Sequence, residues 1–308
     1  MLQTALIAAG GGALSALVSL AAITGAPGGM LLAYFSPLPL MLVGLGLGAA
    51  AIPIAALAGI GVVAGAGGVA AAGVYGGLHA LPSWLVVHQA LIHRPGDASD
   101  PNLWTPPGVI VSLLSVFCAG TVVVGAMLAG GDIEAGVGRV MEEALRTAAP
   151  DLPEADRAAV TAQITPFFVG AVGGMWVIMI ALNAVAAQGL LARRHWNRRP
   201  SPRWSEFTVP NWFAWPLVAA AAIGLVAVGD IRYLARNLVL VFAVPYFFAG
   251  LAVLHTLARR TGAKGLLLAC YYVLLALAFP AIAGATAGLG VIDQWMGIRR
   301  RLPGAPPQ

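Results

Sequence analysis

The first 93 residues of the chain contain no Asp, Glu, Lys or Arg. Charged side chains are expensive at the centre of a bilayer, and a helix needs about 20 predominantly apolar residues to cross one. An uncharged stretch of this length must therefore hold several crossings. The chain is predicted to be an integral membrane protein in contact with the lipid bilayer.

The overall composition supports the same prediction. Hydrophobic residues make up 59% of the chain and charged residues 9%, whereas soluble domains carry roughly a quarter charged residues. The net charge of +5 does not indicate nucleic acid as a partner, because the basic residues cluster in short segments between apolar stretches. No basic residue precedes the first apolar segment, so this segment is expected to be a retained helix rather than a secretory signal.

The apolar pattern predicts an all-α fold, a polytopic transmembrane bundle of kinked, Gly- and Pro-rich helices. One segment covers Leu6 to Thr24, and Pro37 to Ile92 is long enough for three short crossings divided near Pro53 and Tyr75. Five further segments follow the first charged residue, at 108–130, 165–192, 212–228, 238–255 and 265–291. This gives about nine crossings, with eight or ten as alternatives, in a single membrane domain over residues 1–308.

Arginines in the loops predict the orientation. The segment 193–209 carries five arginines before its first acidic residue, Glu206, and is predicted to be a basic cytoplasmic loop. Counting back from it makes the segment around Arg94 internal and the amino terminus internal, and counting forward makes Arg259 and Arg260 internal.

The carboxyl-terminal arginines conflict with this count. Arg299, Arg300 and Arg301 should also be internal, which requires two passes between Gly265 and Gly297. Only about one and a half helix lengths fit there. Two alternatives stay open: Pro280 and nearby glycines break the stretch into a re-entrant pair, or the tail lies outside.

The segment 131–163 is expected to be an external amphipathic helical insert. One face carries Ile133, Val137, Val140, Met141, Ala144, Leu145 and Ala148, and the other carries charged residues. Asp151 and Glu154 have the spacing of a capping box and predict the start of a second helix. A solvated cap over the membrane helices is favoured over a substrate lid, although the surface pattern alone does not separate the two.

Glycines spaced four residues apart predict close helix packing, either within the bundle or against a partner subunit. The pairs are Gly44/Gly48, Gly61/Gly65, Gly73/Gly77, Gly170/Gly174 and Gly284/Gly288. Several prolines also fall in or beside apolar segments, and broken helices line the binding sites of many transporters. Kinks that serve only helix shape are at least as common.

Four polar residues at membrane depth are the candidate ligand-binding or polar-core residues: Asn183, Gln188, His255 and Asp293. Intramembrane polar groups are costly and are functional candidates for that reason. The alternative is structural, because Asn183 and Gln188 can hydrogen-bond to a neighbouring helix and His255 can lie at the negative end of a helix dipole.

Enzyme motifs are missing from the sequence. HExxH, GxSxG, the phosphate loop and the dinucleotide fingerprint do not occur, so no catalytic or cofactor-binding residue is assigned. Cys118 and Cys270 lie far apart in apolar segments, and His88 and His93 are too far apart around a helix to share a metal, so no metal site is assigned. The protein is expected not to be an enzyme.

Short motifs nevertheless resemble a known family. They are YFSPLPLMLVGLGLG (34–48), WTPPG (104–108), Arg199–Pro200 followed by Trp204, PYFFAGLAVLH (245–255), Tyr272 and GVIDQWMGIRRR (290–301). Together they resemble the YybS-like family of bacterial integral membrane proteins, which has no assigned function. The resemblance implies a multi-pass protein of the bacterial inner membrane. The family is itself distantly similar to the substrate-binding subunits of energy-coupling-factor importers, which bind a small molecule and dock on a membrane partner.

Two functional hypotheses follow. The first is a transporter-like subunit that binds a small molecule within the helix bundle, indicated by the prolines, the sparse polar groups and the distant similarity. The second is a non-transporting scaffold or assembly protein, which would dock a membrane protein partner through small-residue helix faces and the basic cytoplasmic loop. An intramembrane enzyme is a third class, disfavoured by the missing motifs.

Overall fold

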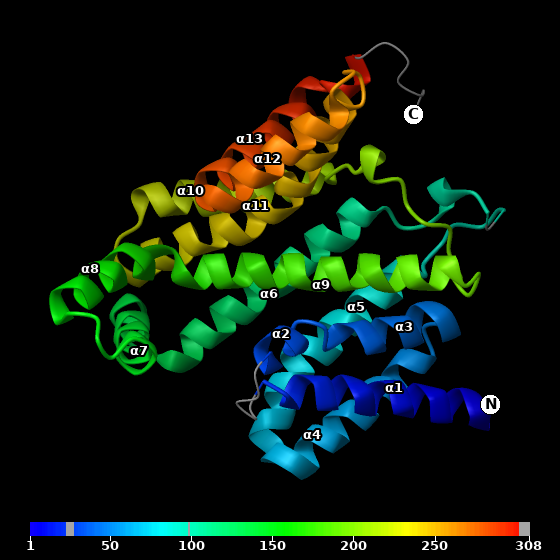
Figure 1. Cartoon of the computed structure of the whole chain (residues 1–308), viewed down its shortest axis with the longest axis horizontal. Helices are drawn as coiled ribbons and strands as arrows, with labels where there is room; N and C mark the ends of the chain where they lie inside the picture. The colour runs from blue at the N-terminus through cyan, green and yellow to red at the C-terminus, as the bar shows by residue number, and fades with distance from the viewer. Residues whose placement is uncertain (23–27, 98, 302–308) are drawn as a thin grey trace. The chain divides into compact units, whose positions relative to one another are not determined.

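The computed structural model describes residues 1–22, 28–97 and 99–301, and every regular element in these ranges is a helix (Figure 1). A membrane offers no partner for backbone N–H and C=O groups, and a helix satisfies them within its own segment. The expected all-α, polytopic helical bundle is confirmed. Within these ranges, six stretches are long and apolar enough to cross a membrane: Leu2–Leu20, Gly29–Leu47, Ala51–Ala90, Pro107–Ala129, Glu154–Arg193 and Gly229–Ala258.

The chain separates into two compact units. The first comprises Met1–Ile110 and Ile178–Arg203, and the second comprises Val111–Val177 and the chain from Trp204 onward. The α-helices are α1 Leu2–Leu20, α2 Gly29–Ala33, α3 Pro37–Leu47, α4 Ala51–Tyr75, α5 Leu81–Ala90, α6 Pro107–Ala129, α7 Ile133–Ala148, α8 Glu154–Ile164, α9 Phe168–Arg193, α10 Ala214–Val226, α11 Gly229–Ala258, α12 Lys264–Leu277 and α13 Phe279–Met296.

In the first unit, α1 packs closely on α4 through small residues. A Cβ on Gly12 would collide with the backbone carbonyl of Ala55, so the two backbones touch without intervening side chains. A buried hydroxyl network crosses the same region. The Tyr75 hydroxyl donates to Ser15 Oγ (2.7 Å), which donates to the carbonyl oxygen of Ser36 (2.6 Å).

Gly68 divides α4 into two halves that pack against each other. Its φ of 81° and ψ of 176° lie outside the helical region, and glycine adopts them without the steric penalty of a Cβ. Tyr75 in the second half lies over Gly59 in the first. The predicted division near Pro53 is confirmed, because α3 ends at Leu47 and α4 begins at Ala51. The division predicted near Tyr75 is wrong, because the chain turns at Gly68 instead. Pro53 lies in the first turn of α4, where a proline is tolerated, and the helix continues past Tyr75 as the π-helical turn Gly76–Ala80.

The second unit is organised around α11, which packs against α10 and α13. A Cβ on Gly250 would collide with the carbonyl oxygen of Thr286, and one on Gly290 with that of Tyr246. These two glycines let α13 approach the backbone of α11. Pro245 lies inside α11, next to this contact, where its missing N–H removes one hydrogen bond of the helix.

A helical hairpin, α12 and α13, occupies the stretch where two passes did not fit by length. The two helices have 14 and 18 residues and meet at Ala278, so they are about 21 Å and 27 Å long. The Tyr271 hydroxyl lies 2.9 Å from Thr286 Oγ1 across the hairpin. The stretch is divided just before Pro280, as the first alternative expects, while re-entry of this pair into the membrane stays a prediction.

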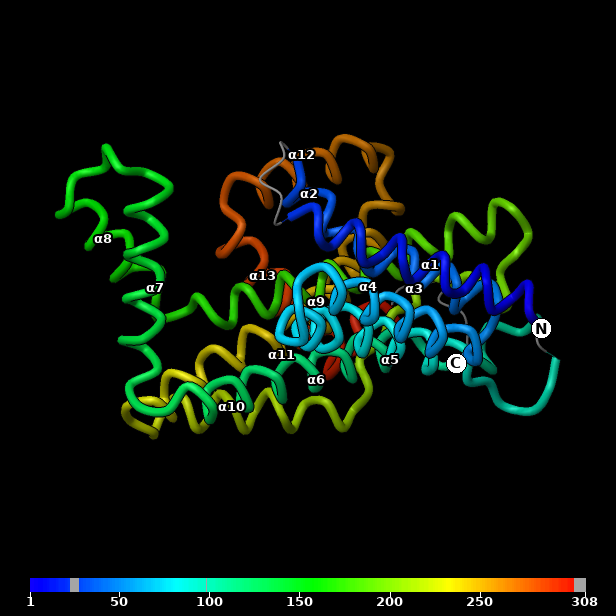
Figure 2. Tube along the Cα trace, turned by 90° about the horizontal axis from the view of Figure 1, so that it is seen from below, coloured from blue at the N-terminus to red at the C-terminus, as the bar shows by residue number. Residues whose placement is uncertain are grey.

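The insert between α6 and α9 forms α7 and α8, which lie side by side at one end of the second unit (Figure 2). The Asp132 carboxylate caps α7 by accepting from the N–H of Ala135 (3.1 Å). The N–H of Ile133 donates to Asp230 at the start of α11 (2.9 Å). The capping box expected at Asp151 is not formed, because α8 begins after Pro153 and has no side-chain cap.

The paired glycines make fewer contacts than expected. Gly44 lies against Val87 and Ile52, and Gly48 takes a positive φ of 111° beside the guanidinium of Arg198. Gly174 is in ordinary contact with Val244, and Gly170 lies on the backbone of Asn237. A Cβ would meet no heavy atom of the described chain within 4 Å at Gly61, Gly65, Gly73, Gly77, Gly284 and Gly288. A role for these six in docking a partner remains a prediction.

The close contact between α11 and α13 can be tested with two matched substitutions. We expect Gly250→Ala to destabilise the protein by about 1–3 kcal/mol or more, because the added methyl meets the carbonyl of Thr286. Gly288→Ala, on α13 but facing open space, should be neutral or slightly stabilising. Thermal unfolding of both variants in detergent measures the difference, and equal midpoints would contradict the contact.

Candidate functional site

The second unit contains a cavity of about 530 Å³ where the ends of α11 and α13 meet the segment 205–211, which begins within the basic loop. This volume lies within the range of small-molecule sites, roughly 300–1,000 Å³. The lining consists of Ser205, Glu206, Thr208, Val209, Pro210 and Asn211 from that segment, Ala249, Thr256, Arg259 and Arg260 from α11 and its end, and Gly290, Asp293, Gln294, Gly297, Arg299 and Arg300 from α13 and its extension.

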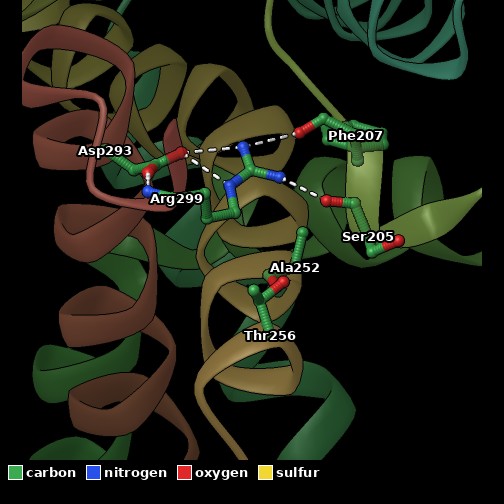
Figure 3. A network of polar contacts seen from close by, with 6 residues as sticks. All are labelled: Ser205, Phe207, Ala252, Thr256, Asp293 and Arg299. Carbon is green, nitrogen blue, oxygen red and sulfur yellow. Dashed lines mark hydrogen bonds and ion pairs between the residues drawn. The ribbon is translucent and has the colours of Figure 1, made fainter. Parts of the chain in front are cut away.

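The end of α13 is set by Gly297, which adopts a left-handed conformation (φ 63°, ψ 46°). Its N–H donates to the carbonyl oxygen of Asp293 (2.8 Å), the usual arrangement of a glycine that ends a helix. The chain then reverses direction. Arg299 consequently lies beside the carboxylate of Asp293 (Figure 3).

Asp293 and Arg299 form a buried ion pair in which each group is hydrogen-bonded. Nε and Nη2 of Arg299 lie 2.8 Å and 2.7 Å from Oδ2 of Asp293, and the Arg299 N–H donates to Oδ1 (3.0 Å). Nη1 donates to the carbonyl oxygen of Ser205 (2.8 Å) and Nη2 to that of Phe207 (2.9 Å). The side chains are only 13% and 6% exposed for Arg299 and Asp293. Fully satisfied buried networks hold a site rigid.

Other polar groups around the cavity are less completely bonded. Thr256 donates its hydroxyl to the carbonyl of Ala252 one turn earlier in α11 (2.7 Å; Figure 3). The Gln294 amide nitrogen lies 3.5 Å from Asn211 Oδ1, while its buried Oε1 has no partner within the described ranges. A buried acceptor without a partner favours binding of a donor.

Aromatic packing fixes the segment 204–213 on α11. Phe207 and Phe213 are fully buried. The Phe207 ring centroid lies 5.9 Å from that of Phe248, and the Phe213 centroid lies 6.1 Å from that of Tyr246. Aromatic pairs at such distances add to the energy of apolar burial. These ring contacts therefore hold in place the carbonyl groups of Ser205 and Phe207, which accept hydrogen bonds from Arg299.

Asn183 and Gln188, on α9, have structural hydrogen bonds in the first unit. The Asn183 amide donates to the carbonyl oxygens of Tyr34 (2.8 Å) and Met179 (2.9 Å). The Gln188 amide donates to the carbonyl oxygen of Arg199 (2.9 Å). Each keeps one buried amide oxygen without a partner in the described part of the chain. A ligand-binding role for either residue is a prediction that these contacts do not test.

His255 and Asp293 both belong to the second unit. His255 Nδ1 lies 2.9 Å from the carbonyl oxygen of Leu251 and Nε2 lies 3.3 Å from the hydroxyl of Tyr272, so the ring links α11 to α12. Asp293 lines the cavity, whereas His255 is the residue before the cavity-lining Thr256. Of the four candidates, Asp293 is the one that contributes to the cavity wall.

The basic loop contains a second buried arginine, Arg199, which is 5% exposed. Its guanidinium donates to the carbonyl oxygens of Ala90 (3.0 Å) and Thr105 (3.4 Å) and lies 5.9 Å from the ring centroid of Trp104. Burial lowers the pKa of Arg199 to about 10, because removal from water disfavours the charged form. Arg199 thus joins the basic loop to the chain at Ala90 and Thr105 in the first unit. From the sequence alone it was assigned only to the arginines that predict membrane orientation.

The motifs that carry the family resemblance meet at these two arginines. Trp104 and Arg199, from two separate motifs, are in contact in the first unit. In the second unit, the motif 290–301 contains Asp293 and Arg299 and packs on the motif 245–255 through Gly290. The sequence pattern does not identify Arg299 as a site residue, because three adjacent arginines near a helix end are typical of a segment that determines membrane orientation.

Within the described ranges, no group of three or more His, Cys, Asp or Glu side chains could hold a metal ion. The family model described as "Predicted membrane protein (DUF2232)" matches residues 13–294 of the chain. That description names no activity. Comparison with curated proteins and with solved structures finds no match.

Breaking the buried pair should cost far more than breaking an exposed one. We expect Arg299→Gln to lower the free energy of unfolding by about 3–5 kcal/mol, because Asp293 stays buried without its cation. Arg146→Gln removes the pair with Glu143 on α7, whose side chains are 66% and 61% exposed, and should cost less than about 1 kcal/mol. Thermal unfolding in detergent compares the two variants, and equal losses would contradict this account of Asp293.

Proposed function

Because the chain belongs to the DUF2232 family of predicted membrane proteins, we propose that it is a transporter-like, multi-pass membrane subunit that binds a small molecule in the cavity of its second unit. The observation that carries this proposal is a cavity of about 530 Å³ whose wall is fixed by the Asp293–Arg299 pair. Ligand sites are typically concave and largely pre-formed, with a few polar groups that fix orientation.

The cavity lining supports this proposal because it combines apolar and polar residues. Val209 and Ala249 are buried and give the cavity an apolar floor. Thr256, Gln294 and Arg259 add hydrogen-bonding groups from both helices and their ends. A ligand would therefore meet apolar contacts and directional polar contacts in one place.

We propose that the cavity opens toward the cytoplasm. Ser205 and Phe207, in the basic loop 193–209, accept hydrogen bonds from Arg299. Arg259 and Arg260, after α11, line the same cavity. These basic positions lie at one end of the second unit, and arginines in short loops mark the cytoplasmic side.

The external position proposed for the insert is supported by its contact with the other end of α11. Asp230, in the first turn of α11, accepts from the N–H of Ile133 at the start of α7. The 30 residues of α11 span about 45 Å, enough to cross a bilayer. If the Gly68 and α12–α13 hairpins each make two passes, the chain has about ten crossings, within the expected range.

The proposed location in a bacterial inner membrane rests on the resemblance to the YybS-like family. Similarity to the substrate-binding subunits of energy-coupling-factor importers belongs to the same proposal. An alternative function is a scaffold that docks a membrane protein partner. It is favoured by the six glycines, such as Gly73 and Gly77, at which a Cβ would meet nothing in the described chain within 4 Å.

Cysteine labelling tests the proposed orientation. In a background with Cys118→Ala and Cys270→Ala, we expect Glu142→Cys on α7 to react with a membrane-impermeant maleimide in intact spheroplasts. Thr261→Cys and Arg300→Cys should react only after the membrane is permeabilised, because both positions follow helix ends at the basic side. Labelling of Thr261→Cys and Arg300→Cys from opposite sides would contradict the shared end of α11 and α13.

Thermal unfolding in the presence of a metabolite library tests ligand binding. We expect at least one molecule to raise the midpoint of the wild-type protein, and Thr256→Phe to abolish this effect by filling the cavity. Thr261→Phe, in the exposed turn after α11, is the control and should keep it. A complete screen without a stabilising ligand, together with recovery of a stable membrane partner by crosslinking, would favour the scaffold instead.

A further inference from the structure

We infer that the cavity of the second unit binds an organic anion whose phosphate or carboxylate group is held between Arg259 and Arg300. The inference rests on the proposed function and specifies the class of ligand. It is motivated by the charges of the lining, by the position of the two arginines and by an unpartnered polar atom beside them.

The charges that line the cavity do not balance. Four arginines and two carboxylates contribute to the wall. Asp293 and Arg299 neutralise each other at 2.7 Å, and the remaining donors of Arg299 are taken by backbone carbonyl groups. The rest of the wall then carries three arginines against one carboxylate, Glu206. A concave site with excess positive charge concentrates anions.

Arg259 and Arg300 approach the cavity from two different elements. Arg259 follows the last residue of α11, and Arg300 follows the reversal at Gly297. Both are exposed, and neither side chain has an ion pair or hydrogen bond within the part of the chain that the structure describes. The Arg300 guanidinium folds over Gly297, where its Nε would lie 2.8 Å from an added Cβ. Guanidinium groups bind phosphate and carboxylate through paired N–H donors.

The remaining lining indicates that the anion has an organic body. Gln294 keeps a buried Oε1 without a partner in the described chain, and a hydroxyl or amine of a ligand would supply the missing donor. Val209, Pro210 and Ala249 offer apolar surface, which inorganic phosphate does not need. A phosphate ester or carboxylate attached to an apolar body fits all three features.

Two sources can supply this chemistry at a membrane surface. One is the headgroup region of an anionic phospholipid, and the other is a soluble organic phosphate. Both would place the anion between Arg259 and Arg300 and the apolar part against Val209 and Ala249. They differ in whether the ligand arrives from the bilayer or from the aqueous phase.

Binding to the purified full-length protein in an uncharged detergent separates these cases. The probes are short-chain phosphatidylglycerol in mixed micelles, with phosphatidylcholine as the neutral lipid, and phenyl phosphate, with inorganic phosphate as the small anion. We expect phosphatidylglycerol or phenyl phosphate to bind more tightly than its comparison molecule, and binding to weaken as salt rises. The lipid identifies a headgroup site, and phenyl phosphate identifies a soluble ligand.

Arg259→Gln/Arg300→Gln is the test variant, and Arg193→Gln/Arg194→Gln removes the same charge from exposed positions of the basic loop. Loss of two charge-assisted contacts should weaken binding of the anion by about 100-fold, whereas the control should change it little. Equal binding by both variants, or binding insensitive to salt, would overturn the inference.

Failure of the inference can be told apart from failure of the proposed function. If a neutral molecule stabilises the wild-type protein and Thr256→Phe blocks it while no anion binds, the anion inference is wrong and the proposed function stands. If neither an anion nor any other molecule binds, both are wrong. Monodisperse elution of each variant in size-exclusion chromatography verifies that the exposed substitutions leave the fold intact.

Discussion

Close backbone contact between α11 and α13 is the interaction on which the candidate site depends. In lipid, apolar side chains gain little from leaving the solvent, so helices associate through tight packing and polar contacts. Gly250 and Gly290 provide that packing. It brings the end of α13 beside the end of α11, and only then can the reversal at Gly297 direct Arg299 toward the carbonyl groups of Ser205 and Phe207.

Arg199 and Arg299 both carry a charge that is largely removed from water, and different groups compensate each charge. Each joins separate chain segments by donating hydrogen bonds to backbone carbonyl groups. Arg299 also pairs with the carboxylate of Asp293. Arg199 instead has two carbonyl oxygens and the ring of Trp104, and its burial away from water lowers the pKa of its guanidinium. A charge in a loop can therefore be part of the interior of a membrane protein.

The sequence predicted what depends on local composition. Long uncharged stretches predicted helices in a membrane, and the confirmed all-α fold follows from that alone. Positions that depend on tertiary contacts were missed. A break was predicted near Tyr75, yet the chain turns at Gly68, one glycine among 39. Spacing identified Gly44 and Gly170, which make close contacts, and also pairs such as Gly61/Gly65, which make none, while it missed the close contacts of Gly12 and Gly250. Asp293 was a candidate from the start, but its partner Arg299 was assigned only a topological meaning.

The α12–α13 hairpin shows why the end of the chain resisted prediction from length. A 14-residue helix spans about 21 Å, which is less than the roughly 30 Å of a hydrocarbon core. If α12 lies in the membrane, it must either thin the bilayer or enter it only partway. Because α13 folds back on α12 and its extension lines one cavity with Arg259, the hairpin returns the chain to the end of α11 that precedes α12. Side-chain contacts thus place Arg299 and Arg300 on the same cavity as Arg259, a proximity that counting apolar residues could not predict.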